Sequence, residues 1–122
     1  MFGLAISALA ALSFLGIGAG AAFAPKALSV NYGIPVDDPA GFAYIRALGA
    51  RDAVLGAIVL ALMATRDHEA LAVTLGLGAL VGAADFSVVC GERGLAARQS
   101  LAIHGAGTLG LIAAALLVRA GR

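Results

Sequence analysis

Four ionisable residues interrupt apolar stretches of the sequence, and they are Arg51, Asp52, Asp85 and His104. Two carboxyls, a guanidinium and an imidazole suffice for acid/base catalysis. One carboxyl, in its ionised form, would activate water. The other carboxyl, in its protonated form, would donate a proton, and the arginine would orient both groups. Asp52 and Asp85 are the candidate base and acid in either order, with Arg51 as the orienting cation and His104 as a proton relay or alternative base. Epoxide opening and isomerisation by proton transfer both fit this set.

Six further residues are candidates for substrate binding or support: Tyr44, Arg46, Gly49, Gly56, Gly82 and Ser100. The three glycines lie three or four positions from Asp52 or Asp85, which places them beside a carboxyl on a helix face. They allow two interpretations, because small residues let helices pack closely in lipid and also leave room for water or a ligand. Tyr44 lies near a helix end, where a tyrosine is usually an interfacial anchor.

The composition is typical of an integral membrane protein. The chain has 122 residues, enough for one domain, of which 61% are hydrophobic and only 12% charged. The net charge of +1 gives no basic surface for nucleic acid, and the single cysteine excludes an intramolecular disulfide. The sequence has no motif for a metal cluster or a nucleotide, so we expect neither metal nor cofactor.

Four apolar segments are long enough to cross a membrane as helices, at about 2–24, 39–65, 69–89 and 95–120. We interpret the first as a retained span and not as a cleaved signal peptide. The breaks "RDHE" and "GERG" are short, which requires antiparallel neighbours. The sequence therefore predicts an all-α membrane protein, an antiparallel four-transmembrane-helix bundle in a single domain over residues 1–122.

The longest connection, residues 25–38, is predicted to be a loop that either caps one mouth of the bundle or lies passively on its surface. Asp37 or Asp38 is expected to cap the helix that follows, with Pro39 in its first turn. We expect residence in a bacterial inner membrane with both termini cytoplasmic, although Lys and Arg are nearly balanced between the two sides.

The antiparallel order brings the polar residues into one half of the bundle, on the side of residues 25–38. Because Arg51 and Asp52 project about 100° apart on a helix, we expect no direct pair between them. The predicted pairs are therefore Arg51 with Asp85, and Asp52 with His104 or Arg46. Unpaired charges at this depth would cost roughly 3 kcal/mol each, so inward-facing partners are expected.

Four stretches carry a resemblance to a known family, and they read "APKALSVNYGIP", "ALGARDAVLG", "GAADFSVVCGERG" and "AIHGAG". Together they resemble a family of small four-helix membrane proteins from bacteria and fungi that is catalogued as a domain of unknown function. Some fungal relatives are described as membrane epoxide hydrolases, and a more distant similarity is to DoxX-like proteins. The resemblance implies that Arg51, Asp52, Asp85 and His104 are the motif positions.

Three functions remain open on the sequence. The first is an intramembrane enzyme that acts on a lipophilic small molecule by acid/base chemistry. The second is a small transporter or proton-coupled carrier, for which buried Asp and His are typical, and which would work as a homo-oligomer. The third is a structural membrane subunit in which an ionic network fixes the helix register.

Overall fold

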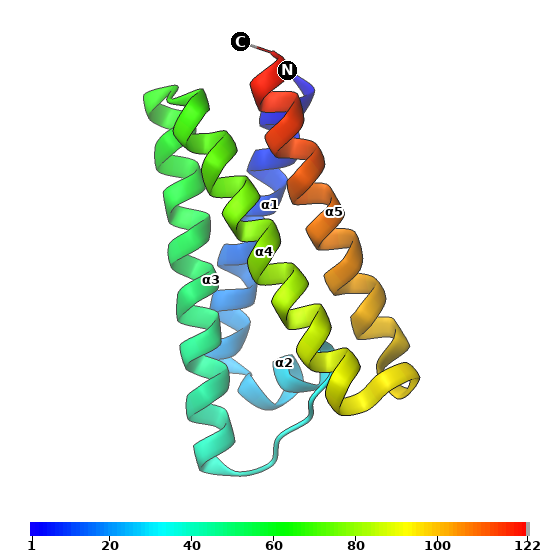
Figure 1. Ribbon diagram of the computed structural model, residues 1–122. Helices are drawn as coiled ribbons and strands as arrows, with labels where there is room; N and C mark the ends of the chain where they lie inside the picture. Colours follow the sequence, from blue (N-terminus) through cyan, green and yellow to red (C-terminus); the bar gives the residue numbers. More distant parts are fainter. Residues whose placement is uncertain (122) are drawn as a thin grey trace.

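The computed structural model describes residues 1–121, and this part of the chain is entirely helical (Figure 1). Its elements are α1 (Phe2–Phe23), α2 (Pro25–Tyr32), α3 (Pro39–Thr65), α4 (His68–Arg93), the 3-10 helix η1 (Gly94–Ala97) and α5 (Arg98–Ala120). Three helical segments are long and apolar enough to cross a membrane, namely α1, α3 and the stretch His68–Ala120 that contains α4, η1 and α5. This is the make-up of an integral membrane protein.

The long helices form two closely packed pairs, α1 with α3 and α4 with α5 (Figure 1). The start of α1 and the end of α5 lie at one end of the molecule, and α2 lies at the other (Figure 1). At the terminal end α1 and α5 touch, because a Cβ atom at Gly3 would lie 2.8 Å from the backbone nitrogen of Val118. The main core also contains buried Val59, Leu71 and Leu75. The two helix pairs are therefore closely packed against each other near the termini.

Two helices begin with side-chain caps that their sequences specify. Asp38 accepts a hydrogen bond from the Gly41 nitrogen at 2.8 Å, and Pro39 follows as the first residue of α3. This confirms the predicted cap and selects Asp38 over Asp37. Asp67 caps α4 in the same way, accepting from the Ala70 nitrogen at 3.0 Å.

The segment 25–38 is not the uninterrupted loop that the sequence predicted, because its first eight residues form α2. Pro25 suits the first position of a helix, and Gly33 ends the helix with a left-handed φ of +108°. Gly33 is also required by packing, since a Cβ there would lie 2.8 Å from the Ser100 and Val89 side chains. The Ser29 hydroxyl accepts a hydrogen bond from the Val36 nitrogen at 3.1 Å, and this bond holds the residues that follow Gly33 against α2.

The predicted ends of two helices are also corrected. The expected helix 69–89 extends over His68–Arg93, and the expected helix 95–120 begins only at Arg98. The "GERG" sequence does not break the helix at its first glycine, since Gly91 remains helical and Gly94, at φ +50°, provides the stop. Residues 94–97 then turn as a tight 3-10 helix and not as the start of α5.

Candidate functional site

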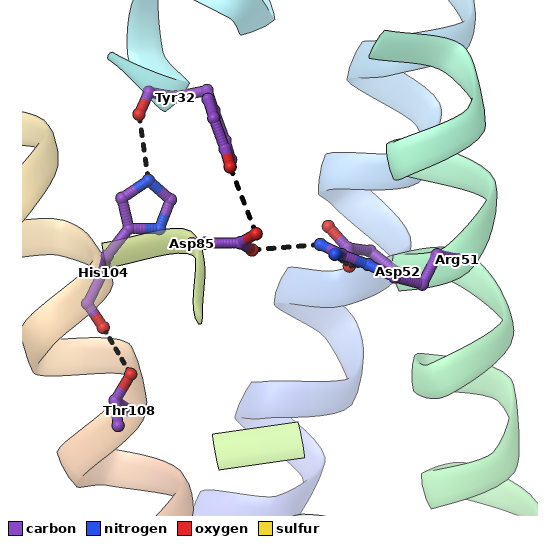
Figure 2. Close-up of polar contacts among 6 residues, drawn as sticks. All are labelled: Tyr32, Arg51, Asp52, Asp85, His104 and Thr108. Carbon is purple, nitrogen blue, oxygen red and sulfur yellow. Dashed lines mark hydrogen bonds and ion pairs between the residues drawn. The ribbon is translucent and has the colours of Figure 1, made fainter. Parts of the chain in front are cut away.

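Arg51 joins two carboxylates (Figure 2). Its Nε donates to Asp52 Oδ1 at 3.0 Å, and its Nη2 donates to Asp85 Oδ2, also at 3.0 Å. The Arg51–Asp85 pair was predicted and is confirmed. The expectation that Arg51 and Asp52 do not pair is wrong, because the guanidinium presents donors on two edges and the long arginine side chain reaches its neighbour despite the 100° offset. The two carboxylate side chains are only 12% and 15% exposed, respectively.

Tyr32, at the end of α2, connects this ionic cluster to α5 (Figure 2). Its hydroxyl donates to Asp85 Oδ1 at 3.1 Å, and its backbone oxygen lies 2.9 Å from His104 Nε2. The rings of Tyr32 and His104 also meet edge to face, with centroids 5.0 Å apart. Burial, followed by the charge of Asp85 and the hydrogen bond to it, raises the pKa of the Tyr32 phenol to about 12. The hydroxyl therefore remains a donor at neutral pH.

The predicted partners of Asp52 are corrected by these contacts. His104 bonds to the Tyr32 backbone, and the Arg46 Nε donates outside the cluster to the Ala22 oxygen at 3.5 Å. Asp52 pairs with Arg51 instead. The reason is geometric, because α2 fills the space beside His104 that the sequence left open.

The cluster lies in the wall of a cavity of about 450 Å³ between the two helix pairs. The side chains that bring polar atoms to it include Tyr32, Arg51, Asp52, Asp85, His104 and Thr108, and most of the remaining lining is apolar. All four residues predicted to be catalytic thus line one cavity. Among residues 1–121, no three His, Cys, Asp or Glu side chains are grouped so as to hold a metal ion.

The six supporting candidates divide between cavity and packing. Gly49 and Gly82 line the cavity, whereas the other four, Tyr44, Arg46, Gly56 and Ser100, are not among its lining residues. Gly49 also packs α3 on α1, because a Cβ there would collide with the Ala21 side chain. For Gly56 the structure favours packing, since a Cβ would lie 2.7 Å from the Ala11 oxygen.

The remaining candidates have other surroundings. Tyr44 is 75% exposed on the outside of α3, where an interfacial tyrosine would lie. Ser100 is buried against Gly33 at the end occupied by α2. Tyr32 was missed, although it lies in one of the stretches that suggested the family and in the segment considered as a cap.

The cavity reaches the outer face of the molecule. Leu9 of α1 and Ile103 of α5 both line it, yet they are 66% and 56% exposed. These two helices pack closely at Gly3 and Val118, near the chain termini and away from Leu9 and Ile103. The opening therefore lies between α1 and α5.

Residues 11–118, most of the chain, match the family described as a domain of unknown function (DUF4267). Comparisons with curated proteins and with solved structures returned no significant match. The extent of the family match is decisive: this chain belongs to the DUF4267 family.

Proposed function

We propose that this protein crosses the membrane four times as an antiparallel bundle and is an enzyme that hydrolyses a lipophilic epoxide within the bilayer. The supporting observation is the Arg51 bridge between two carboxylates in the wall of an otherwise mainly apolar cavity. Helices α4 and α5, with 26 and 23 residues, are each long enough to span alone. Some fungal relatives of the family that the sequence resembles are described as membrane epoxide hydrolases, and this description is the reason for choosing epoxide hydrolysis as the reaction.

The charge of the cluster supports acid/base catalysis. Arg51 with two ionised carboxyls carries a net charge of −1, and one bound proton brings this charge to zero, which an apolar cavity favours. The neutral cluster then holds one carboxylate and one carboxylic acid side by side. This is the pair that water activation and protonation of a leaving oxygen require.

The contacts suggest which carboxyl takes which role. Asp85 accepts hydrogen bonds from two residues, Arg51 and Tyr32, whereas Asp52 accepts from Arg51 and is the more enclosed of the two side chains. We assign Asp85 as the carboxylate base and Asp52 as the acid. Each Asp85 oxygen keeps a further lone pair with which to accept a hydrogen bond from water.

The reaction is balanced with these two groups alone. Asp85 takes a proton from water while the water oxygen bonds to one epoxide carbon. The bond from that carbon to the epoxide oxygen breaks, and Asp52 donates its proton to this oxygen. A vicinal diol forms, and one proton transfer from Asp85 to Asp52 restores the starting state.

The test is hydrolysis of alkyl and terpenoid epoxides by the purified protein in lipid nanodiscs, in water labelled with heavy oxygen. We expect the wild-type protein to form a diol that carries one labelled oxygen. We expect Asp52→Asn and Asp85→Asn to form no diol. Glu92→Gln removes an exposed carboxylate from the same helix as Asp85 and serves as the matched control. Turnover retained in both aspartate variants, or no diol from any epoxide, would refute the proposal. An unlabelled isomer as the product would instead identify an isomerase.

A further inference from the structure

The cavity extends beyond the polar cluster into an apolar compartment. This compartment lies toward the chain termini and is lined by Ile6, Ala10, Gly78, Gly107, Gly110 and Leu111. Gly78 lies seven residues from Asp85 on α4, and Leu111 lies seven residues from His104 on α5. On both helices the compartment therefore reaches about 10 Å past the cluster, at a rise of about 1.5 Å per residue.

Two hydroxyls in the cavity wall are already committed to the backbone. Ser13 donates to the Leu9 oxygen at 2.9 Å, and Thr108 donates to the His104 oxygen at 2.8 Å. Thr108 lies on the side of His104 that faces away from Tyr32, where the apolar compartment begins (Figure 2). The cavity thus has one polar end and one end that offers an occupant almost only apolar contact.

We infer, on the basis of the proposed function, that the substrate is a single-chain amphiphile. Its epoxide would lie against Arg51, Asp52 and Asp85, and its alkyl tail would extend toward Leu111. It would enter sideways from the lipid, through the opening between α1 and α5 where Leu9 and Ile103 are exposed. Gly107 and Gly110 determine the space that the tail has.

The two α5 glycines allow this space to be filled without disturbing the backbone. A Cβ added at Gly107 or Gly110 would meet nothing within 4 Å, although both residues line the cavity. Gly16 of α1 is equally open and does not line the cavity, so it provides the matched control. Leucine at each of the three positions adds the same apolar volume to a helix that faces lipid.

The experiment uses photoaffinity labelling in nanodiscs, which requires no turnover. The probes are long-chain terminal diols, analogues of the expected product, that carry a diazirine either beside the diol or at the far end of the chain. We expect the end-labelled probe to modify α5 near Leu111 and α1 near Ile6. The probe labelled beside the diol should modify α4 near Asp85. Excess unlabelled diol should suppress both reactions.

Gly107→Leu and Gly110→Leu should lose the competable labelling by the end-labelled probe, and Gly16→Leu should retain it. Labelling that unlabelled diol does not suppress, or that is unchanged in both α5 variants, would overturn the inference. The result is separable from the proposed reaction. Correct labelling with active Asp52→Asn and Asp85→Asn variants would reject the reaction alone, while diol formation without competable labelling would reject the amphiphile alone.

Discussion

The ion pair between Arg51 and Asp85 crosses the gap between the two helix pairs. Arg51 is on α3, which packs on α1, and Asp85 is on α4, which packs on α5. Its N–O distance is 3.0 Å, and Arg51 holds Asp52 at the same distance. One guanidinium therefore sets the position of both carboxyls relative to the cavity.

Arg51→Lys should preserve the fold and lose at least about 100-fold in kcat/KM, the scale expected when reacting groups are misplaced by about 1 Å. Lysine keeps the charge, but its compact ammonium lacks the planar fork that reaches two carboxylates at once. Two quantities are measured for each variant: kcat/KM for epoxide hydrolysis in the steady state, and the midpoint temperature of thermal unfolding. Activity near the wild-type value in Arg51→Lys would show that bridging is unnecessary, and Arg46→Lys, outside the cavity, is the control.

Titration of Tyr32 should be displaced to high pH. The Tyr44→Phe variant leaves Tyr32 as the one remaining tyrosine, and its tyrosinate absorbance should have a midpoint near pH 12, whereas the pKa of an unperturbed tyrosine is 10.0. Adding Asp85→Asn should lower the midpoint only in part, because burial is the largest cause of the shift. A midpoint near pH 10 in Tyr44→Phe would contradict the contact with Asp85.

The same shift has a consequence for stability. The pKa of Tyr32 in the folded protein exceeds that of the free side chain, so the stabilisation is complete below pH 10 and is lost as the pH rises toward 12. We expect unfolding of the wild-type protein to become easier across this interval. Tyr32→Phe should remove that part of the pH dependence, and an unchanged profile in this variant would assign the loss to other groups.

His104→Phe should loosen α2. This substitution keeps an aromatic ring beside Tyr32 but removes the 2.9 Å contact from Nε2 to the Tyr32 backbone oxygen. Hydrogen exchange in residues 25–33 should accelerate, with little change in α3. Asp37→Asn, which weakens the exposed pair of Asp37 with Lys26, is the control and should have a smaller effect. Equal protection of α2 in His104→Phe and in the wild type would contradict this role.

Gly49→Ala should destabilise the protein by about 1–3 kcal/mol, the usual cost of overpacking. The new methyl group would collide with the Ala21 side chain where α3 crosses α1. Gly16→Ala, which meets nothing within 4 Å, should instead be neutral or stabilising by up to about 1 kcal/mol. Unfolding in mixed micelles compares the two variants, and equal effects would contradict the close approach.

The proposed four crossings predict that Cys90 lies on the membrane side opposite the termini. Cys90 is exposed, one turn before the end of α4, and it is the only cysteine. A membrane-impermeant thiol reagent should therefore react from the side opposite a C-terminal tag, with Cys90→Ser as the blank. Reaction from the same side as the tag would exclude the four-span topology.

The sequence predicted α1 and α3 closely because each is a long apolar run with clear ends. It missed α2, whose eight residues contain Pro, Asn and Tyr and are helical through docking of Gly33 against Ser100 and Val89. No local pattern indicates such a contact. A short helix that depends on tertiary packing is therefore beyond single-sequence reasoning.

The sequence predicted the four residues Arg51, Asp52, Asp85 and His104 of the candidate site, but only some of the contacts among them. The pair of Asp85 with Arg51 was predicted correctly, because the antiparallel order of the helices places both residues at a similar position along the bundle axis. The Arg51–Asp52 contact was missed because helical angle describes Cβ directions and not the reach of a guanidinium. Tyr32 was missed because its partner, Asp85, lies 53 positions away in the sequence. The two residues meet only because α2, which the sequence did not predict, brings Tyr32 to the cluster.

The turn at Arg66 and Asp67 divides the chain into two complementary parts. The first part supplies Tyr32, Arg51 and Asp52, and the second supplies Asp85 and His104, so neither holds a complete set of polar groups. Membrane insertion of the first part alone would leave Arg51 with Asp52 as its only carboxylate partner in the cluster. Because the second part is synthesised after the first, Arg51 gains its second carboxylate only when α4 brings Asp85 to it, and α5 then adds His104 to the cluster.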